Sequence, residues 1–264
     1  MKSHAIRTLA LSSLLLSLLV VGASANSVSL GTAGSYAVLA GSTVTNTGSS
    51  VITGDLGVWP GTAVTGFPPG IVTGGTTHKG DAAAAQAQLD LTTAYNTAAG
   101  LPRTGTLTGQ NLGGLTLTPG VYFFASSAQL TGQLTLNNLG NPSAIFVFQI
   151  GSTLTTASNS SVIFSNSLAD SNVFWQVGSS ATLGTTTAFQ GNILALSSIT
   201  LNTGATIGCG TALARNGAVT LDSNVIGGGC SSTTTTTVPE SGTLGLLGTG
   251  LAILAGAARR RVRI

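Results

Sequence analysis

The sequence predicts an all-β protein, a parallel β-solenoid of short stacked strands with one helix beside it. Three observations indicate this fold. First, glycine contributes 37 of 264 residues and charged residues only 6%, while Val, Ile, Leu and Phe alternate with Ser, Thr and Asn, as expected for many short strands joined by tight corners. Second, a Thr-Leu unit recurs at a nearly constant period. Third, one Ala-rich segment has helical spacing.

The repeat defines the architecture. Its copies are spaced by 19, 18, 29, 18 and 20 residues and are Thr116-Leu117, Thr135-Leu136, Thr153-Leu154, Thr182-Leu183, Thr200-Leu201 and Thr220-Leu221. A period of 18 to 20 suits one solenoid coil of three strands and is too short for a propeller blade. The spacing of 29 includes the segment 165–170, which we predict to be a looped-out insertion. An antiparallel sandwich is the alternative, but a fixed period favours the solenoid.

Strand alternation points each Leu inward and each Thr outward. Stacking should then align the leucines in an apolar core. Further inward positions are predicted at Ile145, Val147, Val173, Trp175, Val177 and Ile193.

One helix is predicted over 81–99. Leu91, Ala94, Tyr95 and Ala98 fall on one face. Asp81 is a suitable N-cap, and Gly100 followed by Pro102 ends the run. Because Ala-rich faces allow close approach, we expect this helix to pack along the solenoid wall.

The N-terminal end is predicted to be a processing signal. Residues 1–25 contain Lys2 and Arg7, an apolar run and the small-residue site Ala23-Ser24-Ala25, which together indicate a secretory signal peptide removed by signal peptidase. The domain that remains is predicted to span 26–230.

The C-terminal end predicts a second signal, over 238–264, after a Ser/Thr linker at 231–237. It contains Pro239-Glu240, an apolar segment at about 242–258 that could cross a membrane, and a terminal Arg cluster. This order resembles the PEP-CTERM sorting signal of Gram-negative bacteria. The resemblance implies recognition by an exosortase, transient anchoring in the inner membrane, and a final location at the cell surface or outside it.

Nucleic-acid binding and catalysis are not expected. Most basic residues lie in the two terminal signals, so the core, with three bases and five acids, carries a net charge of about −2 and no basic patch. The one core histidine, His78, has no partner histidine and no nucleophile motif nearby, and the core Asp residues are scattered. We therefore predict no enzyme activity, no metal and no cofactor. Cys209 and Cys230, 21 residues apart, are predicted to form a disulfide between adjacent coils, as an exported protein allows.

Aligning the coils on their leucines predicts a polar face. Two residues after successive leucines stand Asn138, Thr156, Thr185, Thr203 and Ser223, and two residues further on stand Ser158, Thr187 and Ala205. If both rows point outward, they form a flat, uncharged grid of hydroxyl and methyl groups. Such a grid can anchor ordered water, although threonine is also simply a good strand residue.

The core resembles the ice-binding-protein-like β-solenoid family. The resemblance covers about residues 28–230 and rests on Leu30–Gly41, Ile52–Val58, Ala94-Tyr95-Asn96, Leu117–Tyr122 and Arg215–Asp222. It implies a discontinuous right-handed parallel β-helix of triangular section, whose N-terminal segment supplies a coil packed against the C-terminal coils.

A Thr-Ala/Gly-x-Thr/Asn motif is frequent on the ice-binding face of active members. It is matched by Thr156-Ala157-Ser158-Asn159 and Thr203-Gly204-Ala205-Thr206, and in part by Thr47-Gly48-Ser49-Ser50. The predicted ice-binding residues are Thr47, Ser49, Thr156, Ser158, Asn159, Thr185, Thr187, Thr203, Ala205, Thr206 and Ser223.

Two functions follow from this fold and surface. The first is adsorption to ice through this face, which would inhibit ice growth or recrystallisation. The second is a non-catalytic structural or adhesive role in the exopolysaccharide matrix.

Overall fold

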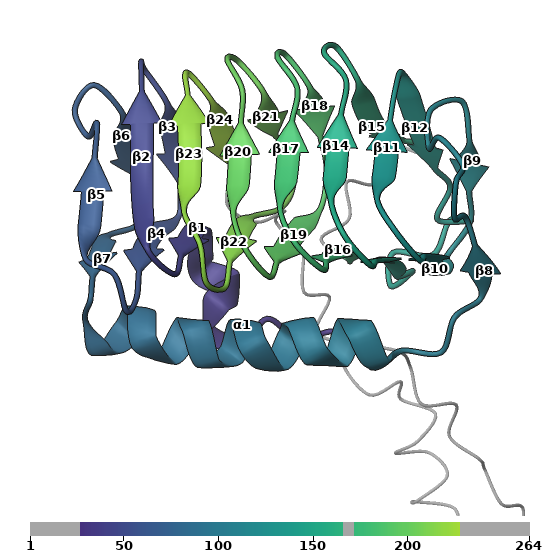
Figure 1. Cartoon of the computed structure of the whole chain (residues 1–264), viewed down its shortest axis with the longest axis horizontal. Coiled ribbons are helices and arrows are strands. Elements are labelled where there is room, and N and C mark those ends of the chain that lie inside the picture. Colours follow the sequence, from purple (N-terminus) through teal and green to yellow (C-terminus); the bar gives the residue numbers. More distant parts are fainter. Residues whose placement is uncertain (1–26, 166–171, 228–264) are drawn as a thin grey trace, which may run out of the picture.

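The computed structural model describes residues 27–165 and 172–227. They form three parallel sheets that wind around a common apolar core, with one long helix along one side (Figure 1). This confirms the predicted β-solenoid. Within the described residues no helix is long and apolar enough to cross a membrane. The predicted signal peptide, insertion loop, Ser/Thr linker and sorting signal lie outside the described ranges, apart from Ser165.

Each sheet takes one strand from each coil. In spatial order, sheet A contains β7 (Thr77–Lys79), β4 (Asp55–Val58), β1 (Tyr36–Ala40), β22 (Ala212–Ala214), β19 (Asn192–Ala195), β16 (Val173–Val177), β13 (Phe146–Ile150), β10 (Gly120–Phe124) and β8 (Gly105–Thr106). Sheet B contains β11 (Ala128–Leu130), β14 (Leu154–Thr156), β17 (Ala181–Leu183), β20 (Ile199–Leu201), β23 (Val219–Asp222), β2 (Thr43–Thr47) and β5 (Ala63–Thr65). Sheet C contains β6 (Ile71–Thr73), β3 (Val51–Thr53), β24 (Val225–Gly227), β21 (Thr206–Ile207), β18 (Ala188–Phe189), β15 (Ser161–Phe164), β12 (Gln133–Leu136) and β9 (Thr116–Leu117).

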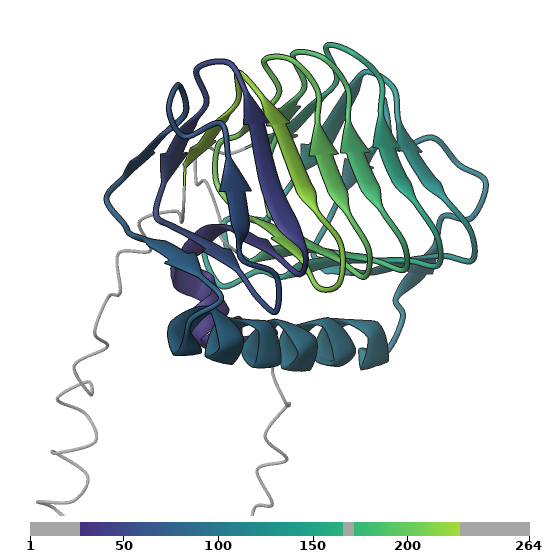
Figure 2. The ribbon, with the colours of Figure 1, turned by 60° about the vertical axis from the view of Figure 1, so that its left-hand side comes forward.

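The coils are not stacked in chain order. Strands β1, β2 and β3 pair with β22, β23 and β24, so the N-terminal coil joins the C-terminal one. The helix α1 (Ala82–Gly100) then runs the length of the stack, and the chain returns coil by coil from the far end (Figures 1 and 2). The predicted discontinuity of the solenoid is therefore confirmed.

The helix begins and packs as predicted. The Asp81 carboxylate accepts a hydrogen bond from the Ala84 amide at 2.9 Å, and Leu91, Ala94, Tyr95 and Ala98 are buried. These side chains contact the outer face of sheet A through a cluster that includes Leu39, Val121, Val147, Phe174, Leu194 and Leu213. At the far end of the helix, the Gln149 side chain donates to the carbonyls of Ala98, Ala99 and Leu101, which satisfies acceptors that a helix end leaves free.

A short 3-10 helix, η1 (Gly31–Ser35), is attached to α1 by Asp90. The Asp90 carboxylate accepts hydrogen bonds from the backbone N–H and the hydroxyl of Thr32, both at 2.7 Å. These bonds, the backbone one first, hold the pKa of Asp90 below its usual value.

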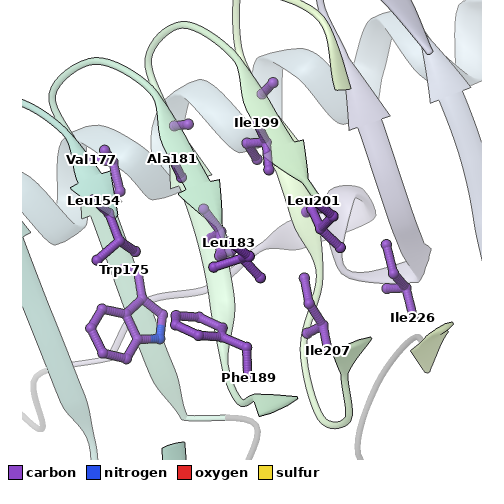
Figure 3. Close-up of a cluster of buried hydrophobic side chains, with 14 of the residues drawn as sticks. Leu154, Trp175, Val177, Ala181, Leu183, Phe189, Ile199, Leu201, Ile207 and Ile226 are labelled. Atoms are coloured by element: carbon purple, nitrogen blue, oxygen red, sulfur yellow. The ribbon is translucent and has the colours of Figure 1, made fainter. Parts of the chain in front are cut away.

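The interior is built from rows of like residues. Leu183, Leu201, Ile199, Trp175 and Phe189 lie side by side in the core (Figure 3), and the rings of Phe148 and Trp175 stack with centroids 3.8 Å apart. Val173, Trp175, Val177 and Ile193 face this core as predicted.

The prediction for Ile145 and Val147 is wrong, because they pack on the helix side while Phe146 and Phe148 face the core. Both faces of sheet A are buried, so apolar alternation cannot distinguish them.

The copies of the Thr-Leu unit lie on two different sheets, although their spacing along the chain is nearly constant. Thr116 and Thr135 lie on sheet C, in register with each other, whereas Thr182, Thr200 and Thr220 lie on sheet B. Leu154 pairs with Ala181, so Thr155 and not Thr153 is in register with Thr182. The buried Cys209 follows β21, but its predicted partner Cys230 lies beyond the described residues, so the disulfide stays a prediction.

The core predicts a clear contrast between neighbouring positions of one strand. Leu201→Ala should lower the free energy of unfolding by about 2–5 kcal/mol, because it leaves a cavity in a closely packed row. Thr200→Ala, on the outer face of the same strand, should cost about 1 kcal/mol or less. Urea unfolding of both variants checks this, and equal losses would contradict the assigned strand faces.

Candidate functional site

Sheet B carries a ladder of threonines on its outer face. Parallel pairing places six of them in one line across six neighbouring strands, and the seventh position is Gln129. The Thr ladder consists of Thr155, Thr182, Thr200, Thr220, Thr45 and Thr65. Figure 1 shows these strands side by side above the helix. With strands about 4.8 Å apart, the ladder extends over about 24 Å.

A second row of small residues runs beside the Thr ladder. It lies two residues earlier on each strand, at Ser127, Thr153, Ser180, Ser198, Ala218, Thr43 and Ala63. Across the strands of sheet B the single charged side chain is Asp222, at the end of β23. The outer face of sheet B is therefore a nearly uncharged array of hydroxyl and methyl groups.

The hydroxyls of the Thr ladder are available to solvent. Four of the six side chains are exposed, and Thr182 and Thr200 are half-buried between their neighbours. Within the described residues, none of the six hydroxyl groups makes a hydrogen bond to the protein. Each can therefore donate one hydrogen bond and accept two from water.

Most of the predicted ice-binding residues lie beside this ladder, at the corner between sheets B and C. The exposed members are Thr47, Ser49, Ser158, Asn159, Thr185, Thr203 and Ser223. Each coil turns this corner through one residue with positive φ, and in successive coils these are Asn159 (60°), Thr186 (54°), Gly204 (70°), Ser223 (53°) and Gly48 (78°). The Asn and Gly of the motif thus occupy positions that the turn itself selects.

Three predicted members are not available for contact, and their outward placement is wrong. Thr156, Thr187 and Ala205 are buried, with exposed fractions of 3%, 0% and 0%. The hydroxyls of Thr156 and Thr187 are 2.8 Å apart, and the Gly184 amide donates to the Thr156 hydroxyl at 2.8 Å. These groups satisfy the backbone of the corner from inside. Asn138, aligned with the same row, is also buried and follows β12 of sheet C.

These residues were placed outward because the alignment on leucines assumed the same strand register in every coil. Two residues after Leu183 or Leu201 the chain has left its strand and is exposed at the corner. Two residues after Leu154 the chain is still within β14, at Thr156. In the next coil the position equivalent to Thr156 is occupied by Leu183, which points inward. The outward Thr of the Thr-Leu units at 182, 200 and 220 was the signal that identifies the ladder.

Sheet C is the other sheet with an open outer face, and it is more apolar. Val225, Val51 and Ile71 are in register, and Val225 and Ile71 are about half exposed, at 49% and 50%. Thr206, a predicted ice-binding residue, lies in this row next to Val225 on β21. Sheet C therefore has no continuous line of hydroxyl groups comparable with the Thr ladder.

His78 lies in a hydrogen-bonded chain near the start of the helix. Its Nδ1 is 2.8 Å from Asp81 Oδ2, and its Nε2 is 2.7 Å from the Thr76 hydroxyl. The Ala84 amide first, and His78 second, hold the pKa of Asp81 below its usual value. Burial raises the pKa of the neighbouring Tyr36 to about 12, with smaller contributions from Asp55 and Asp81. Both ring nitrogens of His78 are engaged, and they connect β7 to the N-cap of α1.

The described part of the chain contains no cluster of three or more His, Cys, Asp or Glu side chains that could hold a metal ion. The candidate site is the surface formed by the outer face of sheet B and the adjoining corner.

Comparison with known proteins agrees with this fold and surface. A family described as ice-binding-like matches residues 38–227. The chain belongs to this family. An ice-binding protein of Nostoc sp. (strain HG1) is 61% identical over 237 residues, which are 89% of this chain and 87% of the relative. A solved ice-binding protein from an Antarctic biological consortium is 55% identical, with a TM-score of 0.72 over 75% of this chain and 89% of the other.

A fungal member shows the same fold at greater distance. The ice-binding protein of the Antarctic ascomycete Antarctomyces psychrotrophicus is 43% identical, with a TM-score of 0.73 over 77% of this chain and 99% of the other.

The two neighbours Thr155 and Thr156 provide a test of the assigned faces. Thr156→Val should lower the free energy of unfolding by about 1–3 kcal/mol, because the Gly184 amide and the Thr187 hydroxyl lose a buried partner. Thr155→Val removes the same group from the surface and should leave stability nearly unchanged. Urea unfolding measures both free energies of unfolding. A Thr156→Val variant as stable as the parent would contradict the buried hydrogen bonds of Thr156.

Proposed function

We propose that this protein is a non-catalytic, extracellular ice-binding protein whose sheet B adsorbs to ice and inhibits its growth or recrystallisation. The observation that carries the proposal is the Thr ladder, with six threonines in register and hydroxyls that have no partner among the described residues. The names of the family and of its Nostoc relative support the same activity.

The physical basis is the order that such a surface imposes on water. Each threonine presents a methyl group and a hydroxyl group, and identical units recur about every 4.8 Å across the sheet. The hydroxyls anchor water, and the methyls provide no stronger polar site to compete with them. A water layer held in a regular array can join a growing crystal, so the protein freezes onto the ice surface.

The near absence of charge on the strands of sheet B matters for the same reason. Charged groups hold tightly bound hydration shells whose geometry differs from that of a crystal. Most of the charged residues of the described chain lie away from sheet B, around the helix and sheet A, as Lys79, Asp81, Asp90 and Arg103 do. The Thr ladder therefore contains no charged group that would hold water in a competing arrangement.

The place of action rests on the two ends of the sequence. We propose that residues 1–25 direct export and that the C-terminal segment, with Pro239-Glu240, retains the protein at the surface of a Gram-negative cell until an exosortase processes it. An exported location suits a protein whose ligand is ice forming around the cell.

Bulky substitutions on the ladder test the proposal. Thr182→Tyr combined with Thr200→Tyr should raise the protein concentration needed to inhibit ice recrystallisation by at least about tenfold, because the rings would hold ice away from the sheet. Thr116→Tyr, on an exposed strand of sheet C, is the matched control and should behave as the parent. Thermal unfolding of each variant reports whether the fold is intact.

The outcomes separate the two functions that the sequence predicts. Inhibition by the parent that only the sheet B variant loses would support ice binding by the Thr ladder. A folded parent without any inhibition would exclude ice binding and favour the structural role in the exopolysaccharide matrix.

A further inference from the structure

Asp222 is the one charged side chain on the strands of sheet B. It follows Thr220 of the Thr ladder by two residues, and so points outward on the same face. On the neighbouring strand β2 it is in register with Thr47. The corresponding positions of the coils on its other side hold uncharged residues, among them Asn202, Gly184 and Ala157. The carboxylate therefore interrupts a line of neutral groups at the edge of the proposed ice-binding surface.

Among the described residues, the Asp222 carboxylate accepts hydrogen bonds from two corner hydroxyls and forms no salt bridge. Thr203 Oγ1 donates to Asp222 Oδ2 in a short hydrogen bond, and Ser223 Oγ donates to Oδ1 at 3.3 Å. The close contact between the His78 ring and the Asp81 carboxylate lies elsewhere and does not involve Asp222. Within the described residues, the charge of the partly exposed Asp222 is therefore stabilised by these two hydroxyl hydrogen bonds and by solvent.

These contacts change what the corner can offer to water. A carboxylate only accepts hydrogen bonds, and the hydroxyls of Thr203 and Ser223 have committed their hydrogens to it. All three groups therefore act only as acceptors. In ice each water molecule donates two hydrogen bonds and accepts two. At these three residues every bound water molecule must donate, so the water there cannot adopt the balanced pattern of ice. Hydroxyls of the Thr ladder, in contrast, can both donate and accept.

We propose that Asp222 determines where the ice-binding surface ends. Its carboxylate keeps the water around Thr203, Asp222 and Ser223 in the arrangement of liquid water instead of that of ice. The residue then limits the affinity of the face. This inference rests on the proposed function and adds to it a named residue that works against adsorption.

Asp222→Asn is the decisive variant. An amide keeps an acceptor for Thr203 and adds a donor for water, while the backbone bonds of residue 222 to Gly204 and Asn224 remain. We expect inhibition of ice recrystallisation at about two- to tenfold lower protein concentration, which is roughly the value of one added net hydrogen bond. Asp222→Ser provides a second neutral variant in case the amide impairs folding.

Two controls separate the local charge from other effects. Asp222→Glu keeps the carboxylate and should gain nothing. Asp55→Asn raises the net charge by the same amount on strand β4 of sheet A, away from the face, and should match the parent. Thermal unfolding of all variants identifies any that are misfolded.

A gain in both neutral variants, with none in the controls, would support the proposal. Equal or weaker inhibition by a folded Asp222→Asn or Asp222→Ser protein would overturn it while leaving ice binding by the Thr ladder intact. If the parent itself does not inhibit, the proposed function fails first, and the two failures are distinguishable.

Discussion

In-register parallel pairing is the constraint on which the rest of the structure depends. Each backbone ladder fixes which residue lies beside which in the next coil, so Thr182, Thr200 and Thr220 must line up once their strands pair. The same pairing aligns Leu183 with Leu201 inside. One geometric rule thus produces both the apolar rows that stabilise the solenoid and the polar row that faces solvent. A slip of one residue would exchange the two faces.

The seam between the two ends of the chain extends this surface. Strand β2 pairs with β23 although they are far apart in sequence, and Thr45 and Thr65 thereby continue the line begun by Thr155. Residues 222–224 help to hold the seam, since the Ser223 amide donates to the Thr47 carbonyl and the Asn224 amide to the Ser50 hydroxyl. A third of the Thr ladder therefore exists only because the N-terminal coil docks.

The helix and the corner restrict where a binding surface can lie. Helix α1 covers the outer face of sheet A, so within the described residues the open outer faces are those of sheets B and C. The corner between these sheets uses some of its polar groups internally, as Thr156 and Thr187 do in the core and Thr186 does toward Asn159. The hydroxyls of the Thr ladder are left for water, as are those of Thr47, Ser158 and Thr185 at the corner, and the ladder is distinguished by the register of its threonines on six neighbouring strands.

The sequence by itself determined the class of fold, the helix from its cap Asp81 to Gly100, and the inward leucines of the later coils, because these follow from local periodicity and capping. It also contained the outward threonines at 182, 200 and 220. What it could not determine was the register where coil length changes: Gln129 and Thr182 are 26 and 27 residues from Thr155, whereas later steps are 18 and 20. Only the tertiary structure decided that Leu154 pairs with Ala181, that Thr156 is buried, and that Thr45 and Thr65 join the ladder. Pairing between distant strands is set by packing of the whole core, and no local pattern within a single coil encodes it.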